Sequence, residues 1–279
     1  MSFSLDLRYQ ICLQPVELPV FNPVALELLQ LLAEPDCDLD AVISIINKDQ
    51  ALAIQILKLA NSSAFAGRTR METIKDSVNR LGAQVISGLA MAASQAALHT
   101  SSIPIVNEIL QNLWQHSYAC ALGCRSLALG IGRRDMADQA YLAGLLHDIG
   151  KLYLLKAMER IRLNSELSFE LDRETLLDVF SAMHVEQGYR IMWHWNIPEV
   201  YCNVVASHHA DLCPPDDALT AIVRVVNFNS MGYNLNPYPQ ILQPQDIQPE
   251  ISYLGITDNM LKQLEEDMAA STMTRSEAP

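Results

Sequence analysis

The sequence predicts an all-α protein with no β-sheet. Apolar residues recur at helical spacing along most of the 279 residues, whereas the alternating pattern of a half-buried strand is absent at any useful length. Half of the residues are hydrophobic, and a chain of this length can bury a substantial core in one large or two modest domains. We therefore expect helices that pack on helices.

The first predicted helices follow an acidic start at Asp36 and Asp38. The apolar face of the first repeats at i, i+3, i+4 and i+7: Leu39, Val42, Ile43 and Ile46. Asp49 is the predicted N-cap of the next helix, because its carboxylate can accept from an unpaired amide of the first turn. That helix ends near Asn61, in a sequence that favours turns.

A third helix is predicted over residues 74–81, where Gly82 ends it, and a fourth over residues 85–98. The sequence Ser101-Ser102-Ile103-Pro104 favours a break in the chain. We therefore expect an N-terminal helical half in residues 1–103 and a second helical half in residues 104–233.

The C-terminal segment, residues 234–279, is expected to be mostly irregular. Four prolines, Pro237, Pro239, Pro244 and Pro249, exclude a long helix across residues 234–250, which we expect to form a loop. A short helix over residues 258–268 precedes a polar tail that we expect to be disordered.

Charge and hydropathy exclude several classes of protein. The net charge of −13 argues against a broad surface for a phosphate backbone, so we expect no broad nucleic-acid binding. The N-terminal residues lack the pattern of a secretion signal, and the least polar stretch, residues 85–98, is too short to span a bilayer. These observations predict a cytoplasmic protein with no membrane segment.

The six cysteines are scattered and form no C-x-x-C pair, which favours reduced and mostly buried thiols. Cys120 and Cys124 lie one helical turn apart and can share a face. Small apolar packing is the better interpretation of this pair than metal binding.

The strongest chemical signal is His147-Asp148-Ile149-Gly150 with Lys151, inside the apolar helical run of residues 141–155. Imidazole nitrogens and carboxylate oxygens are good ligands for divalent transition metals, and a buried charge needs a partner. The pair therefore predicts a metal site. The alternative is a buried hydrogen-bonded pair that holds helices in register without a metal.

Several further stretches resemble the signature segments of the HDOD domain, a bacterial signalling branch of the HD phosphohydrolase superfamily. These stretches are Leu18-Pro19-Val20, Lys48-Asp49-Gln50-Ala51-Leu52, Leu57-Lys58-Leu59-Ala60-Asn61-Ser62 and Ile74-Lys75-Asp76-Ser77-Val78-Asn79-Arg80-Leu81-Gly82. The resemblance covers residues 18–229. It implies an HD-superfamily helical bundle preceded by an N-terminal helical subdomain.

The resemblance also implies a set of metal ligands. His116 is similar to the first ligand of HD phosphohydrolases, and His147 with Asp148 forms the central pair. His184, His208 and His209 match the additional positions of di-metal HD-GYP phosphodiesterases, and Asn227 stands where a late aspartate is expected. Asparagine brings no negative charge to such a site. The implied cofactor is one or two divalent ions of iron, manganese or zinc.

Two functions follow from the resemblance. In the first, the protein is a signalling output module that retains a metal site and binds a protein partner or a small ligand. In the second, it is a metal-dependent phosphohydrolase of a phosphorylated small molecule, with Asp148 and Lys151 as catalytic residues. In that hypothesis His116, His147 and Asp148 hold the ion, a water activated there attacks phosphorus, and Lys151 balances the developing charge.

Hydrolysis of cyclic di-GMP by the HD-GYP route is not expected. The Gly-Tyr-Pro element is missing, and the chain after His209 reads Ala210-Asp211-Leu212-Cys213-Pro214-Pro215. This departure and Asn227 favour the signalling module, whereas the retained histidines favour the enzyme.

Overall fold

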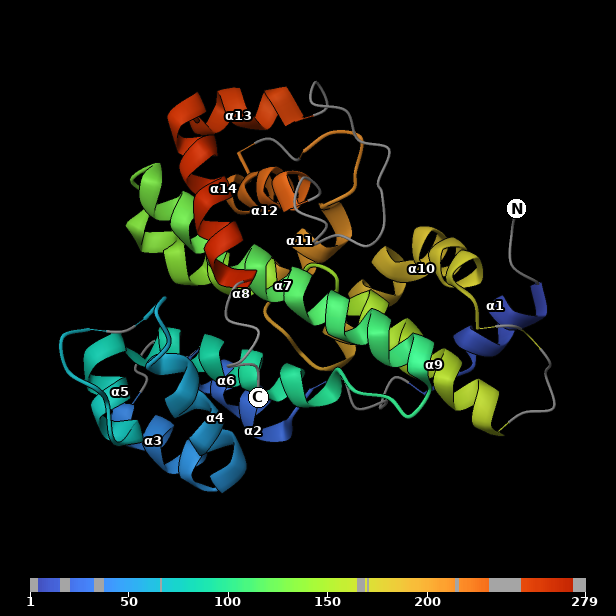
Figure 1. Cartoon of the computed structure of the whole chain (residues 1–279), viewed down its shortest axis with the longest axis horizontal. Coiled ribbons are helices and arrows are strands. Elements are labelled where there is room, and N and C mark those ends of the chain that lie inside the picture. Colours follow the sequence, from blue (N-terminus) through green and yellow to red (C-terminus); the bar gives the residue numbers. More distant parts are fainter. Residues whose placement is uncertain are drawn as a thin grey trace. The chain divides into compact units, whose positions relative to one another are not determined.

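The computed structural model describes residues 5–15, 21–32, 38–65, 67–164, 169, 171–213, 216–230 and 247–272. Within these ranges every regular element is a helix, so the prediction of an all-α fold without a sheet is confirmed (Figure 1). The chain divides into two compact units, and each is described by itself. The small unit comprises residues 21–98, and the large unit comprises residues 1–20 with residues 99–274.

The small unit is built from short helices with apolar inner faces. They are α2 (Pro23–Leu32), α3 (Leu39–Asn47), α4 (Gln50–Ala60), α5 (Ile74–Leu81) and α6 (Ala83–Leu98). The predicted cap is confirmed, because the Asp49 carboxylate accepts from the backbone amide of Leu52 at 3.0 Å. Helix α5 begins with a capping box of Thr73 and Asp76 and ends at Gly82, whose φ of 86° suits glycine.

The large unit is organised around the long helix α7 (Pro104–Gly130), whose first turn contains the proline predicted to follow a break. Its other helices are α1 (Leu5–Cys12), α8 (Ala137–Leu146), α9 (Ile149–Asn164), α10 (Arg173–His194), α11 (Glu199–Ser207), α12 (Ala218–Ser230), α13 (Gln248–Leu254) and α14 (Asp258–Thr272). Helix α7 packs against α8, α12 and α14, and Figure 1 shows it running through the middle of this unit. Cys124, Ala140, Ile222 and Leu264 belong to the buried cluster between these helices.

The sequence predicted one helical run over residues 141–155, but the structure has two helices there. Helix α8 ends at Leu146 and α9 begins at Ile149, so His147 and Asp148 lie in the turn between them. His147 keeps helical dihedrals, φ −53° and ψ −34°, and its amide donates to the carbonyl of Ala143 at 3.0 Å. Apolar spacing cannot reveal a turn that preserves local helical geometry.

The prediction of a loop over residues 234–250 is wrong at its C-terminal end. Helix α13 begins at Gln248 and carries Pro249 in its first turn. The missing N–H of proline is tolerated there, because N–H groups of the first turn have no acceptor within the helix. Helix α14 extends the predicted last helix as far as Thr272. The rest of the predicted loop and the predicted tail lie outside the described residues.

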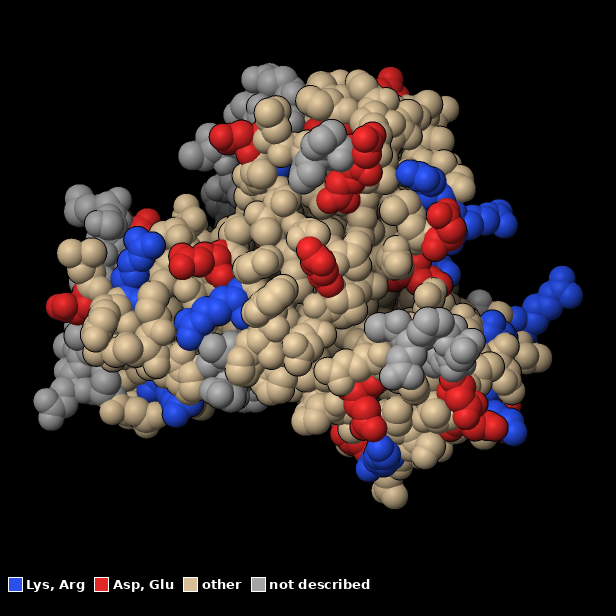
Figure 2. Space-filling view, turned by 180° about the vertical axis from the view of Figure 1, so that it is seen from behind, with Lys and Arg blue, Asp and Glu red and all other residues tan. Residues whose placement is uncertain are grey.

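Charged side chains are dispersed over the face shown in Figure 2. On that face, Lys and Arg side chains of the described residues lie at several separate places, with acidic or uncharged surface between most of them. Among the described residues, no helix is both long enough and apolar enough to cross a membrane.

Candidate metal centre

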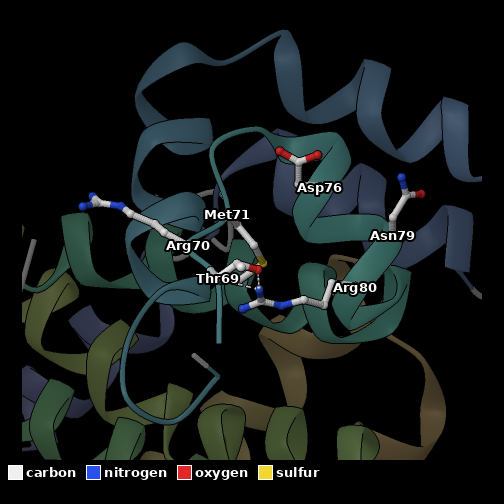
Figure 3. A pocket seen from close by; sticks show the side chains of 6 residues that line it. All are labelled: Thr69, Arg70, Met71, Asp76, Asn79 and Arg80. Carbon is white, nitrogen blue, oxygen red and sulfur yellow. Dashed lines mark hydrogen bonds between the residues drawn. The ribbon is translucent and has the colours of Figure 1, made fainter. Parts of the chain in front are cut away.

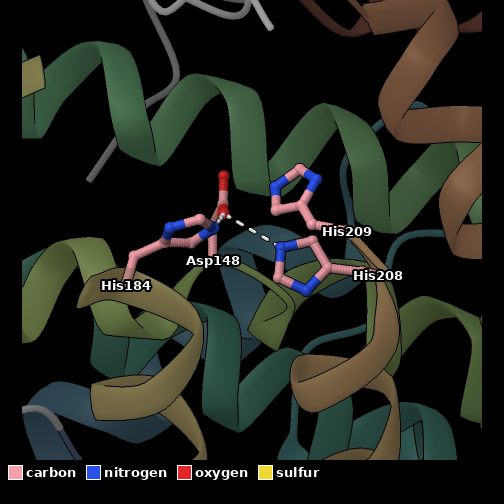
Figure 4. Close-up of side chains that lie close together, drawn as sticks. All are labelled: Asp148, His184, His208 and His209. Carbon is pink, nitrogen blue, oxygen red and sulfur yellow. Dashed lines mark ion pairs between the residues drawn. The ribbon is translucent and has the colours of Figure 1, made fainter. Parts of the chain in front are cut away.

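The carboxylate of Asp148 lies at the centre of a buried group of histidines. Its Oδ2 atom is 3.3 Å from His116 Nε2 and 3.4 Å from His147 Nε2. Its Oδ1 atom is 3.5 Å from His208 Nε2 and 3.8 Å from His184 Nε2. Figure 4 shows His184 and His208 pointing toward Asp148 from two different helices. One carboxylate therefore faces two imidazoles with each of its oxygens.

Separate elements of the large unit supply these side chains. His116 comes from α7, His184 from α10, and His208 from the C-terminal end of α11. Helices α9 and α10 approach each other closely at Gly150 and His184. A Cβ atom added to Gly150 would lie 1.9 Å from the His184 carbonyl oxygen. Gly150 is therefore required for the packing that brings α10 up to Asp148.

Backbone carbonyls fix the orientation of three of the rings. The Nδ1 atoms of His147, His184 and His208 lie 2.7, 2.6 and 2.8 Å from the carbonyl oxygens of Gly144, Phe180 and Val205, respectively. A carbonyl oxygen only accepts, so each Nδ1 carries a hydrogen, and Nε2 is the atom whose lone pair is available when the ring is neutral. Those three lone pairs face the carboxylate of Asp148.

The orientation of the His116 ring is fixed in a similar way, but by the hydroxyl group of Ser230 in place of a backbone carbonyl. Ser230 donates to the Asn227 carbonyl oxygen at 2.6 Å, which leaves Ser230 Oγ to accept from His116 Nδ1 at 3.4 Å. The His116 Nε2 atom then lies 3.2 Å from His147 Nε2. Two nitrogen lone pairs at this distance repel each other unless a proton or a cation lies between them.

Burial favours the neutral form of His116, His184, His208 and His209. It lowers the pKa of His116 to about 4 and the pKa of His184 to about 3. It also lowers the pKa values of His208 and His209. Neutral imidazole is the protonation state that binds a metal ion.

Asp148 is a carboxylate anion in this centre. Burial alone raises its pKa, but the Lys151 ammonium holds that pKa well below its ordinary value. Lys151 Nζ lies 2.6 Å from Asp148 Oδ2. Lys151 is itself buried, with 3% of its surface exposed, so it faces Asp148 rather than open solvent.

The donor set fits a divalent cation. Among the described residues, the buried atoms Asp148 Oδ1, His184 Nε2, His208 Nε2 and Asn227 Oδ1 have no hydrogen-bond partner. An ion would provide the missing partner, and nitrogen and oxygen ligands suit zinc, iron and manganese. Two groups have candidate ligand atoms within 4.8 Å of one another: Asp148, His184, His208 and His209, and His116, Cys120 and His147.

The predicted ligands gather as the sequence analysis expected, although their role as ligands stays a prediction. His209 joins the group through its ring, whose centroid is 5.0 Å from that of His184 and 4.0 Å from that of His208. Asn227 is buried on α12, three residues before the serine that contacts His116. Lys151 contacts Asp148, as its place in the motif implied.

Sequence analysis assigned Cys120 to apolar packing and did not name Ser230, but both side chains lie against His116 in the centre. Cys120 Sγ lies 3.8 Å from both ring nitrogens of His116, and Ser230 contacts the same ring. Burial raises the pKa of the Cys120 thiol far above its usual range. A signal was available for Cys120, which follows His116 by four residues and so lies on the same helix face.

A second buried ion pair lies next to the His208 segment. Arg224 Nε is 2.6 Å from Glu250 Oε1, and Arg224 Nη1 donates to the Ala210 carbonyl at 2.6 Å. Arg224 Nη1 also donates to the Ser207 carbonyl at 3.3 Å. This guanidinium therefore fixes the backbone on both sides of His208 and His209.

A pocket on the surface of the small unit is lined by the residues labelled in Figure 3. Its Arg80 donates to the carbonyl oxygen of Thr69, while Arg70 points away from Arg80. These side chains do not point toward a common position, unlike the histidines that surround Asp148.

The sequence matches the profile of the HDOD domain over residues 18–211. An uncharacterized protein of Treponema pallidum (strain Nichols) is 25% identical over 233 residues, which are 81% of this chain and 44% of that protein. The chain thus spans less than half the length of this relative.

Two solved structures share the fold. One is a protein of Shewanella amazonensis SB2B that is described as a proposed metal-dependent phosphohydrolase. Its TM-score is 0.73 and its identity 20%, with 96% of each chain covered. A proposed signal transduction protein of Marinobacter aquaeolei VT8 has a TM-score of 0.65 and 19% identity, covering 98% of this chain and 63% of that one. At these identities the similarity concerns the fold.

Proposed function

The chain belongs to the HDOD domain family, and we propose that it is a bacterial signal-transduction module with a divalent metal in the Asp148 centre. In this proposal His116, His147, His184, His208 and His209 hold one or two ions together with Asp148, and Asn227 adds a neutral oxygen. The metal stabilises the arrangement of α7, α9, α10 and α11. The module acts by binding a protein partner of a signalling pathway.

The observation that carries this proposal is the closure of the centre. His147 is 0% exposed, Asp148, His116 and His208 are each 1% exposed, and His184 is 6% exposed. In a structural metal site protein ligands fill every coordination position, whereas a catalytic site keeps one position for water or substrate. Burial of these five residues restricts the access of water and substrate to the centre, although His209 at its edge is partly exposed. A closed centre therefore supports a structural ion more than turnover.

The position of Lys151 supports the same conclusion. A lysine that stabilised a substrate phosphate would have its ammonium group free to meet that phosphate. Lys151 Nζ instead lies 2.6 Å from Asp148 Oδ2. Its charge serves to balance the carboxylate.

The second candidate function is a metal-dependent phosphohydrolase or phosphodiesterase. The gathering of all six histidine and aspartate positions favours it, because a structural site needs fewer ligands. A divalent ion at this place would lower the pKa of a water molecule to about 7. Asp148 would orient the ion, and Lys151 would have to leave Asp148 to meet a phosphorylated small molecule.

Assays on phosphomonoesters, nucleotides and cyclic dinucleotides separate the two functions. The full chain and Asp148→Ala are each incubated with manganese, iron or zinc, and circular dichroism checks that both are folded. We expect no turnover that depends on Asp148. Turnover by the wild type that disappears in Asp148→Ala would establish the phosphohydrolase instead.

A further inference from the structure

The distances around His116 have the dimensions of a tetrahedral site. With metal–nitrogen and metal–oxygen distances of about 2.0–2.1 Å, the ligand atoms of a tetrahedral ion lie about 3.3 Å apart. His116 Nε2 and His147 Nε2 are 3.2 Å apart, and Asp148 Oδ2 is 3.3 and 3.4 Å from these two atoms. These three atoms form one face of a tetrahedron.

The fourth position is close to a sulfur atom. A metal–sulfur distance of about 2.3 Å places a thiolate about 3.6 Å from a nitrogen ligand of the same tetrahedron. Cys120 Sγ lies 3.8 Å from both ring nitrogens of His116, so it is beside the ring and has to move to reach the fourth position. The group His116, Cys120 and His147 has its ligand atoms within 4.8 Å of one another. Cys120 is 1% exposed, so this sulfur is sheltered from solvent.

Charge favours sulfur at this position. Asn227 stands where the resemblance implies an aspartate, so the centre lacks one anionic ligand. The carboxylate of Asp148 is also shared with Lys151 at 2.6 Å. A divalent ion deprotonates a thiol that coordinates it, and the resulting thiolate restores the missing negative charge.

We propose that Cys120 is a metal ligand, which completes a site of His116, His147, Asp148 and Cys120 and makes it selective for zinc-like ions. This inference rests on the proposed metal centre and adds a thiolate to its ligands. Soft thiolate ligands favour zinc over manganese, whereas a site of nitrogen and oxygen alone discriminates less between them.

Cys124 provides a matched control on the same helix. It is buried, one turn after Cys120, and its Sγ lies 2.8 Å from the position of a Cβ atom added to Gly144. Cys124 is thus packed against α8 and belongs to the apolar cluster between α7 and α12. Cys120→Ala and Cys124→Ala each remove one buried sulfur atom, but only the former removes the proposed ligand.

Cobalt(II) reports the ligand directly, because thiolate coordination adds a charge-transfer absorption in the near ultraviolet that nitrogen and oxygen ligands do not give. The full chain, Cys120→Ala, Cys120→Ser and Cys124→Ala are titrated with cobalt. We expect the thiolate band in the wild type and in Cys124→Ala and its loss in both Cys120 variants. Removing this ligand should also weaken zinc binding at least about tenfold.

The outcomes separate this inference from the proposed function. Visible cobalt bands without the thiolate band in the folded wild type would overturn the role of Cys120 and leave the metal centre intact. The absence of any cobalt spectrum would overturn the metal centre itself. If Cys120→Ala does not fold, X-ray absorption of the zinc-loaded wild type decides the question: a sulfur neighbour at about 2.3 Å supports the proposal, and nitrogen and oxygen neighbours alone contradict it.

Discussion

Asp148 and Glu250 are two buried carboxylates of the large unit whose charges are balanced in different ways. Within the described residues, the ion-pair partner of Glu250 is Arg224 at 2.6 Å, and that guanidinium also binds carbonyl oxygens after α11. Asp148 has Lys151 at the same distance, but four imidazole nitrogens surround it as well.

The difference shows how a structural ion pair can be told from a ligand site. A guanidinium carries a permanent charge and many hydrogen-bond donors, so the Arg224–Glu250 pair stabilises the fold without any ligand. Burial lowers the pKa values of His116, His184 and His208 around Asp148, and their neutral rings present lone pairs to a carboxylate oxygen. A cation lowers the energy of that arrangement, whereas the Arg224–Glu250 pair gains nothing from one.

The largest expected effect comes from breaking the Arg224–Glu250 pair. Arg224→Met leaves the Glu250 carboxylate buried without its charge partner, and we expect it to lower the free energy of unfolding by about 3–5 kcal/mol. Denaturant unfolding with and without added metal measures this loss. The double variant Arg224→Met with Glu250→Leu should recover most of it. An unchanged stability in Arg224→Met would contradict the role of the pair.

The pH dependence of the metal-free chain should distinguish the two centres. The pKa of His184 is about 3 in the folded chain, against an ordinary value of 6.5. Between these pH values the unfolded state binds the proton and the folded state does not. This histidine therefore leaves the free energy of unfolding unchanged above about pH 6.5 and lowers it as the pH falls toward about 3. The slope per histidine is about 1.4 kcal/mol per pH unit.

His184→Gln tests this dependence. We expect unfolding in the presence of a chelator to show a slope smaller by about 1.4 kcal/mol per pH unit between about pH 6 and about pH 4. The double variant of Arg224 and Glu250 should keep the wild-type slope. An unchanged slope in His184→Gln would mean that this imidazole is charged in the folded chain.

The smallest expected effect belongs to a carboxylate in the small unit. Asp49 caps α4 at a partly exposed position, and Asp49→Ala should lower the free energy of unfolding by about 1 kcal/mol. Asp49→Asn keeps an oxygen acceptor and should lose only a fraction of this. Thermal unfolding compares the two variants, and equal losses would show that the side-chain oxygen does not matter as a cap.

The local features of the fold could be predicted because they depend on neighbouring residues. The cap at Asp49 and the end of α5 at Gly82 follow from side-chain and backbone preferences within one turn. The turn at His147 could not be predicted, since its dihedral angles are helical. Pro249 misled the prediction because a proline is also tolerated in the first turn of a helix.

The centre itself was predictable through the resemblance, which proposed histidines far apart in the chain as partners of Asp148. The residues that position it were not predictable in this way. The contact between Gly150 and the backbone of His184 and the pair of Arg224 with Glu250 exist only after the helices have packed. Cys120 carried a local signal, because it follows His116 by one helical turn, but the sequence favoured packing since buried cysteines usually act as small apolar residues.

Metal analysis of the wild type and Asp148→Asn tests the central claim most directly. Both proteins are made without a histidine tag, incubated with manganese, iron and zinc, and freed of unbound ions. We predict at least one ion per chain in the wild type and almost none in folded Asp148→Asn, because the carboxylate that joins the imidazoles is lost. A wild type that binds no ion, or two proteins with equal metal content, would contradict the account.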